Sequence, residues 1–259
     1  MSRVDQARKG FLKRDVKAIV KSHTASAIRN SFRHQEMHLS SFNLPEIILG
    51  GQDGLVNVLG VVLGVAVATL SAKIVIIAAL SATFAESISM GAVAYTSKLA
   101  EADYYQSELE RESWEIDHVP QGEREEIKVL YETYGFKGKI LDDIVDKITS
   151  DKKVWLKVMM EQELKLEEVD RKQALPAAFI VGVSAIVGSF IPLFAFFFLP
   201  VKTAIIVSFV VSAVTLFVVG YYKAKQTLGR QLVKQGIEMA TIGMASALVS
   251  YLVGVLLKI

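Results

Sequence analysis

Two apolar stretches between residues 45 and 97 are each long enough to cross a bilayer, yet each contains a carboxylate. The first stretch holds Asp53 and the second holds Glu86, and neither contains a basic residue. A charged side chain inside a membrane costs about 2.5–3.5 kcal/mol on insertion scales, so it needs a partner, a water-filled cavity or an ion. We therefore expect a cation from outside the chain as the partner of these carboxylates.

The spacing of the polar side chains favours one shared ion path. At about 1.5 Å per residue, Asp53 lies roughly 12 Å from the start of the first stretch, and Met90 lies roughly 12 Å from the end of the second. In an antiparallel pair both residues therefore have the same depth. Glu86 lies one turn deeper than Met90, and Asn57 lies one turn beyond Asp53. The sequence predicts that these four residues line a path toward the midplane.

The types of ligand in this path indicate which ions it suits. Carboxylate and amide oxygens together with a thioether suit a borderline divalent ion such as Fe²⁺ better than Ca²⁺ or Mg²⁺, which prefer oxygen alone. Packing is the alternative role of Met90.

Five glycines give the first helix a surface that another helix can approach closely; they are Gly50, Gly51, Gly54, Gly60 and Gly64.

Composition and periodicity predict an all-α membrane protein with five transmembrane helices. Hydrophobic residues make up 52% of the 259-residue chain, which is too apolar for an ordinary soluble domain. We divide the chain into a basic amphipathic segment (1–43), helices 1 and 2 (44–98), an acidic helical insert (99–174) and helices 3 to 5 (175–259). The last three spans are expected at 175–199, 201–222 and 236–257, with a kink at Pro192.

Charge is segregated along the chain and predicts its orientation. Residues 1–40 hold nine Lys or Arg against three acids, and residues 99–174 hold twenty acids against twelve bases. By the positive-inside rule, the basic N-terminus and the Lys/Arg cluster after the fourth span lie in the cytoplasm. The acidic insert is then cytoplasmic and the C-terminus lies outside. Glu238, at the start of the last span, is interpreted as structural.

The first 43 residues read as a basic amphipathic helix. Val16, Ile19 and Val20 recur at helical spacing between lysines. Such a helix lies on an anionic leaflet or packs on the transport domain. His34 and His38 flank Glu36, but this arrangement is not the HExxH motif of zinc peptidases.

The insert is predicted to be helical up to about Asp117 and again over 122–134, 137–149 and 151–170. It carries two ExxE pairs, each of which places two carboxylates on one helix face. These are Glu112 with Glu115 and Glu123 with Glu126, and the segment ends with Met159, Met160 and Glu163. The residues alone leave two alternatives open, a metal site and a solvated acidic face. Di-iron bundles take a Glu-x-x-His motif from each of two helices, and the chain lacks that pair.

Three stretches make the chain resemble the vacuolar iron transporter family. They are DGLV at Asp53 to Val56, ESISMG at Glu86 to Gly91 and MMEQEL at Met159 to Leu164, within a similarity that runs from about Leu44 to Ile259. Five spans with a cytoplasmic insert after the second is also the layout of that family. The basic N-terminus and the Lys-rich insert depart from its pattern.

The resemblance implies a homodimer with an ion path between the two copies of the first helix, and exchange of Fe²⁺ for protons. It assigns Asp53, Glu86 and Met90 to that path. It also implies a cytoplasmic metal-collecting site made of Glu112, Glu115, Glu123, Glu126, Met159, Met160 and Glu163.

The function expected from the sequence is secondary transport of Fe²⁺, with Mn²⁺, Co²⁺ and Zn²⁺ as further candidates, out of the cytosol. No GxxxxGK[ST] motif suggests ATP as the driver, and no enzymatic activity or resident cofactor is expected. The expected partners are membrane lipid, divalent metal ions and a second copy of the chain, and not nucleic acid. The expected location is the plasma membrane of a prokaryote or the vacuolar membrane of a eukaryote. The alternative is a membrane-anchored metal buffer or sensor without transport.

Overall fold

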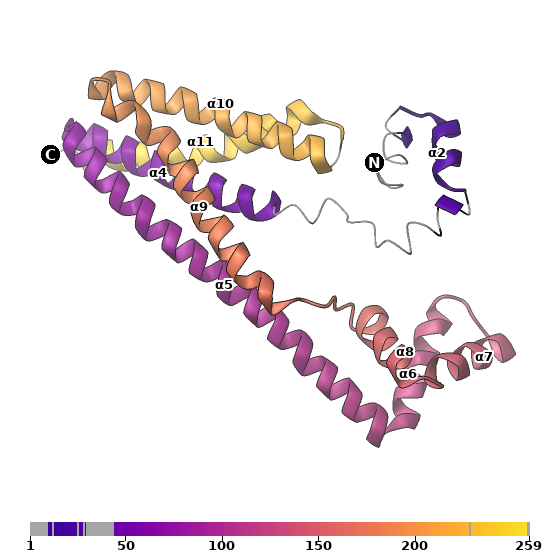
Figure 1. Ribbon diagram of the computed structural model, residues 1–259. Coiled ribbons are helices and arrows are strands. Elements are labelled where there is room, and N and C mark those ends of the chain that lie inside the picture. The colour runs from indigo at the N-terminus through magenta and orange to yellow at the C-terminus, as the bar shows by residue number, and fades with distance from the viewer. Residues whose placement is uncertain are drawn as a thin grey trace. The chain divides into compact units, whose positions relative to one another are not determined.

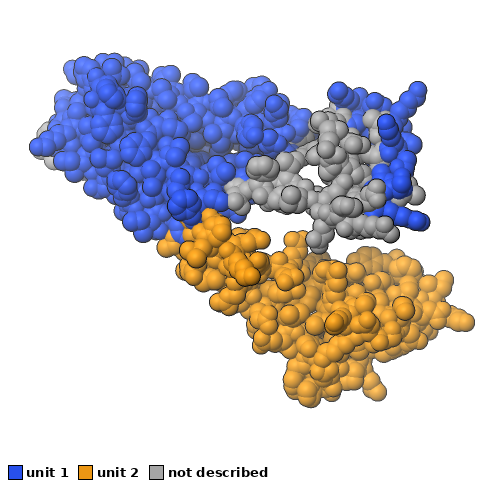
Figure 2. Space-filling model, in the orientation of Figure 1, with its two compact units in different colours: residues 1–91, 179–259 blue, residues 92–178 orange. Residues whose placement is uncertain are grey.

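The computed structural model describes residues 10–11, 13–24, 26–27, 29, 44–227 and 229–257. All the regular secondary structure of these residues is helical, as the periodicity predicts (Figure 1). The chain divides into two compact units (Figure 2). One unit comprises residues 1–91 and 179–259, and the other comprises residues 92–178.

Five helices of the described residues are long and apolar enough to cross a membrane, which confirms the expected number of spans. They are α4 (Leu44–Thr69), α5 (Ala72–His118), α9 (Ala174–Leu193), α10 (Val201–Thr227) and α11 (Leu232–Leu256). Within the first unit, α10 lies beside α11, and α4 packs against both (Figure 1).

The connections in this unit are short and follow local sequence signals. Only Leu70 and Ser71 separate α4 from α5, so these two helices form an antiparallel hairpin. Leu70 takes a left-handed conformation, with φ 49°, which turns the chain sharply. Pro192 lies in the last turn of α9, and the chain continues as a 3₁₀ helix over Phe194–Phe197. The hydroxyl of Ser208 on α10 donates to the Pro192 carbonyl.

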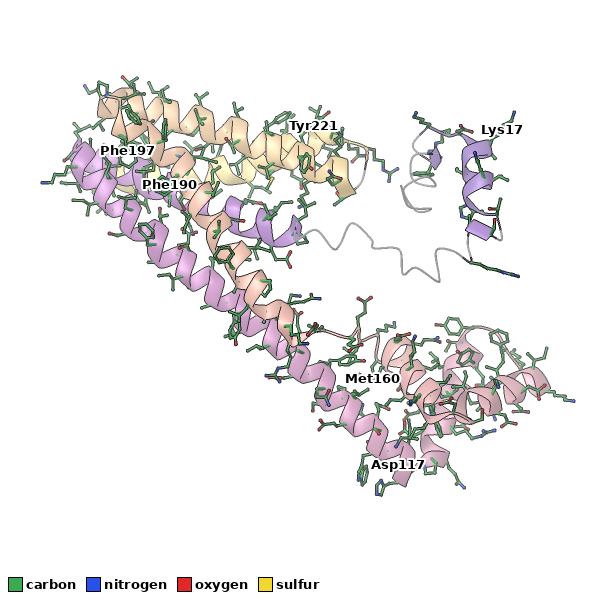
Figure 3. The ribbon with its side chains drawn as sticks, in the orientation of Figure 1. Lys17, Asp117, Met160, Phe190, Phe197 and Tyr221 are labelled. Carbon is green, nitrogen blue, oxygen red and sulfur yellow. The ribbon has the colours of Figure 1, made fainter. Side chains whose placement is uncertain are left out.

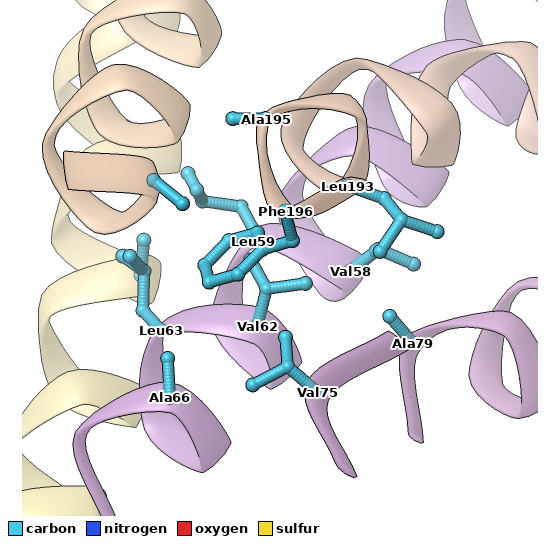
Figure 4. Packing of buried hydrophobic residues seen from close by; sticks show 12 residues of the cluster. Val58, Leu59, Val62, Leu63, Ala66, Val75, Ala79, Leu193, Ala195 and Phe196 are labelled. Carbon is cyan, nitrogen blue, oxygen red and sulfur yellow. The ribbon is translucent and has the colours of Figure 1, made fainter. Parts of the chain in front are cut away.

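One face of α4 forms the centre of the apolar core of the first unit. Val58, Leu59, Val62 and Leu63 are fully buried on it. They pack with Val75 and Ala79 of α5, Leu193 of α9 and Phe196 of the 3₁₀ helix (Figure 4). Burial of this face leaves the side of α4 that carries Asp53 and Asn57 outside the core.

The second unit contains the end of α5 and three shorter helices, α6 (Pro120–Thr133), α7 (Gly138–Thr149) and α8 (Lys152–Val158). Their apolar faces meet in a small core of Ile116, Ile127, Leu141, Val145, Ile148, Trp155 and Met159. The second span and the first part of the insert belong to one helix of 47 residues, α5. The helix continues from one to the other because no glycine or proline occurs between Gly91 and Pro120.

One predicted helix of the insert is too long. We expected a helix over 151–170, but α8 passes into a π-helical turn at Met159–Glu163 and the helical conformation ends there. Lys165 has a left-handed backbone, with φ 56°, which an α-helix does not accommodate. The chain then runs without helix as far as Asp170.

The N-terminal segment is only partly described. The helix α2 (Val16–Ser22) contains three of its predicted apolar positions, Val16, Ile19 and Val20. Val16 and Val20 are exposed. His34, Glu36 and His38 lie outside the described residues.

Candidate functional site

The polar side chains of α4 and α5 meet inside the first unit. Asn57 Nδ2 donates a hydrogen bond to Glu86 Oε1 over 2.8 Å, which joins the two helices at the level of these residues. The carboxyl of Asp53 also lies within interaction range of the carboxyl of Glu86. The structure thus brings together three of the four residues predicted for the membrane path.

Met90 extends this polar group along α5. It lies one turn after Glu86 and is half-buried, as Asp53 and Glu86 are, whereas Asn57 is exposed. Because α4 and α5 are antiparallel, the contact between Asn57 and Glu86 directs the preceding turn of α4, which carries Asp53, toward the following turn of α5, which carries Met90. This register agrees with the equal depth inferred from the sequence.

The glycines of α4 accommodate helices of the same chain. A Cβ at Gly54 would lie 2.2 Å from the carbonyl oxygen of Ala185 on α9. A Cβ at Gly60 would lie 2.7 Å from the hydroxyl of Ser250 on α11. These two faces of α4 are therefore closed by α9 and α11. Gly60 lies seven residues after Asp53, on nearly the same line along α4, so α11 covers the surface of α4 beyond the turns that carry Asp53 and Asn57.

The second unit contains a compact group of carboxylates. Glu112 and Glu115 on α5 and Glu123 on α6 each offer an oxygen within 4.8 Å of the other two. The side chains of Glu112 and Glu123 are almost fully enclosed, with 1% and 5% of the residue surface exposed. One buried oxygen of each, Oε2, has no hydrogen-bond partner among the described residues. Buried carboxylate oxygens normally have partners, so this arrangement fits a cation better than a solvated acidic face.

Crowding and burial favour the protonated form of Glu123 in the absence of metal. Burial, together with the charges of Glu126 and Glu112, raises the pKa of Glu123 to about 8. Burial also raises the pKa of Glu112, although Arg111 opposes that shift. A divalent ion that binds to Glu123 at neutral pH must therefore displace a proton.

The π-helical turn contains three more of the predicted ligands, Met159, Met160 and Glu163, whereas Glu126 lies on α6. The buried Oε2 of Glu163 has no hydrogen-bond partner in the part of the chain that the structure describes, and burial together with the charge of Glu126 raises the pKa of Glu163 to about 7. Met159 and Met160 follow α8 and are buried, and Met160 is labelled in Figure 3. Met159 belongs to the apolar core of the unit, so packing accounts for its burial. π-Helical turns of this kind occur frequently at functional sites.

The interpretation of the sequence missed Arg111. Its guanidinium donates to Glu112 Oε1 and Glu115 Oε2, each over 2.5 Å, and to Glu108 Oε2 over 2.8 Å. Arg111 lies three residues after Glu108 and four before Glu115, a spacing at which side chains meet on one helix face. The signal was therefore present in the sequence. His118 lies three residues after Glu115. Its Nδ1 forms a hydrogen bond with the Trp114 carbonyl, and its ring stacks on the Trp114 ring.

Comparison with known proteins identifies a family that covers most of the chain. The model of the VIT family matches residues 44–255, which include both groups of polar residues described above.

Individual relatives cover similar lengths. The chain is 33% identical over 212 residues to vacuolar iron transporter 1 of Arabidopsis thaliana, covering 81% of this chain and 84% of that protein. It is 32% identical over 220 residues to vacuolar iron transporter 1 of Tulipa gesneriana, covering 84% and 89%. It is 31% identical over 264 residues to the vacuolar iron transporter of Plasmodium falciparum, covering 98% and 96%.

Proposed function

Because this chain belongs to the VIT family, we propose that it is a secondary transporter that moves Fe²⁺ out of the cytosol in exchange for protons. It is an integral membrane protein, and metal-ion transport is the activity that its relatives' names give. Mn²⁺, Co²⁺ and Zn²⁺ are further candidate substrates, since they are borderline or neighbouring divalent ions that accept the same ligands.

The observation that carries this proposal is the meeting of Asp53, Asn57 and Glu86 between two spans. Two carboxyls that interact inside a membrane avoid an unpaired negative charge only by binding a proton or a cation. A mere membrane anchor has no use for this arrangement. Competition between Fe²⁺ and a proton for the same carboxyls is the minimal requirement for antiport.

A homodimer is part of the proposal. The polar face of α4 is only partly covered by α5 in the single chain, since Asp53 is half-buried and Asn57 is exposed. In a bilayer this face would contact hydrocarbon unless protein or water covered it. α9 packs on α4 at Gly54, and α11 packs on it further along, at Gly60. A second copy that packs on the polar face would enclose the ion path between the two α4 helices.

The orientation and the role of the insert complete the proposal. The basic N-terminus and the insert lie in the cytoplasm, as the distribution of Lys and Arg favours. The carboxylate cluster of Glu112, Glu115 and Glu123 collects divalent ions there, with Glu126, Glu163 and the thioether of Met160 or Met159 as additional ligands. Its enclosed, unpartnered oxygens support this role.

The alternative function is a metal buffer or sensor in which the insert binds metal and the spans only anchor it. Uptake of Fe²⁺ into proteoliposomes, compared with liposomes that lack protein, separates the two functions. A transporter accumulates Fe²⁺ in the lumen, where external chelator cannot remove it. A buffer binds Fe²⁺ that the chelator removes completely.

Met90→Leu should weaken transport of Fe²⁺ more than transport of Mn²⁺. Leucine preserves the volume of the side chain and removes the sulfur, which is the softer ligand of the path. The measurement is the initial rate of uptake for each ion at matched concentrations. Met244→Leu is the control, because Met244 packs against the apolar core. Equal losses for both ions in Met90→Leu would assign Met90 to packing.

Changing Glu112, Glu115, Glu123 and Glu126 together to glutamine should lower the number of divalent ions that the full-length protein binds. Glutamine preserves helix propensity and side-chain shape while four charges are lost. Isothermal titration calorimetry in detergent measures the stoichiometry. The control removes four acidic groups from exposed positions of the same insert, namely Glu125, Glu132, Asp142 and Asp143. Unchanged stoichiometry in the first variant would return the cluster to a solvated acidic face.

A further inference from the structure

Arg111 is a cation that the chain itself places in its carboxylate cluster. Its Nη2 donates to Glu112 and its Nη1 donates to Glu115, each over 2.5 Å. These two glutamates, with Glu123, form the group whose oxygens approach one another within 4.8 Å. In the metal-free protein, part of the negative charge available to a metal ion is therefore neutralised by the guanidinium.

A guanidinium and a divalent ion cannot share these carboxylates without cost. Arginine has five N–H donors and no acceptor atom, so it cannot become a ligand. A divalent ion bound to the oxygens of Glu112 and Glu115 would lie within roughly 5 Å of the guanidinium, a range in which like charges repel strongly in a partly buried site. The ion also withdraws electron density from the carboxylate oxygens that accept hydrogen bonds from Arg111.

The structure provides Arg111 with a second partner outside the enclosed group. Nε and Nη2 both donate to Glu108 Oε2, over 3.0 and 2.8 Å. The side chain of Arg111 is 44% exposed, so it can turn toward water without disturbing the apolar core. Release from Glu112 and Glu115 would leave its pair with Glu108 intact.

We propose that Arg111 is a displaceable counter-ion of the insert's metal site, which holds Glu112 and Glu115 in the metal-free protein and is released from them when a divalent ion binds. The inference rests on the proposed metal-collecting role of the insert and adds a determinant of its affinity. Arg111 stabilises the empty site and repels the ion in the occupied one, so it weakens binding. A collecting site with moderated affinity releases its ion for onward transport.

The test is an anoxic titration of the full-length protein in detergent with Fe²⁺ alone, in which calorimetry measures the affinity. Arg111→Gln should bind Fe²⁺ at least about tenfold more tightly than the wild type, because the competing charge is gone. Arg111→Lys retains the charge but loses the planar fork that bridges two carboxylates, so its affinity should lie between the two.

Arg124→Gln is the matched control. Arg124 lies in the same insert with 43% of its side chain exposed, and it pairs with Asp146 and Thr149 outside the carboxylate cluster. Its substitution should change the affinity for Fe²⁺ by less than about twofold, as expected for an exposed charge that salt screens. Equal or weaker binding by Arg111→Gln would overturn the inference and assign Arg111 a positioning role.

A measurement on the wild type keeps the inference testable if the variants do not fold. Phenylglyoxal modifies accessible guanidinium groups, and mass spectrometry locates the modified residues. Saturating Fe²⁺ should increase modification of Arg111 and leave Arg124 unchanged. Equal modification of Arg111 with and without Fe²⁺ would contradict release. If the wild type binds no Fe²⁺ at the insert, the collecting role itself fails together with this inference; normal binding without any effect of Arg111 refutes the inference alone.

Discussion

Replacing Asp53 by alanine should abolish Fe²⁺ transport and leave the folded protein intact. The substitution removes one of the two carboxyls that meet between α4 and α5, so an ion in the path loses an anionic partner. A charge without its partner in a span costs roughly 2.5–3.5 kcal/mol on insertion scales, which corresponds to a loss of about 100-fold in occupancy. The initial rate of Fe²⁺ uptake into proteoliposomes measures the effect.

Glu238→Ala is the matched control for this experiment. Glu238 is also a carboxylate on a predicted span, but it is exposed in the second turn of α11, where it accepts a hydrogen bond from Gln235 over 3.2 Å. Its removal should leave the rate close to that of the wild type. Size-exclusion chromatography of both variants checks folding and assembly. Transport by Asp53→Ala at the rate of the wild type would show that the ion follows another route.

Glu86→Gln should eliminate the response of transport to a pH gradient. Glutamine retains an oxygen that accepts from Asn57 Nδ2, so the contact between α4 and α5 is preserved while the exchangeable proton is lost. In vesicles whose insert faces outward, an acidic lumen should accelerate Fe²⁺ entry by the wild type and not by the variant. Glu238→Gln should respond as the wild type does.

An equal response of Glu86→Gln and the wild type to the gradient would place proton coupling elsewhere. No response of the wild type would indicate a channel or uniporter. These outcomes are distinct because the same vesicles report Fe²⁺ entry with and without the gradient. The two results therefore test the role of Glu86 separately from transport itself.

The arrangement of the spans could be predicted because it depends on regular geometry. A turn of two residues fixes α4 and α5 as antiparallel, and the helical repeat then brings Asn57 opposite Glu86. The number of spans follows from five apolar stretches of sufficient length. Neither inference requires knowledge of side-chain packing.

The structure of the insert could be predicted less completely because it depends on side-chain packing and on local backbone conformation. Glu112 and Glu123 become enclosed because apolar faces of α5, α6 and α8 meet beside them, and a count of acidic residues does not reveal this. The helix that we expected to reach residue 170 ends earlier because of the π-helical turn and the left-handed backbone of Lys165. Arg111 was missed because the acidic residues were considered without the basic residue between them.

The central claim is that Fe²⁺ and protons exchange through the carboxyls of the membrane path. Simultaneous recording of luminal Fe²⁺ and luminal pH in proteoliposomes of the wild type tests it most directly, with Fe²⁺ added outside and no gradient imposed. We expect Fe²⁺ to enter while protons leave, so the lumen becomes more alkaline, and neither change should occur with Asp53→Ala. Entry of Fe²⁺ at constant luminal pH would contradict proton exchange, and the absence of any entry would contradict transport.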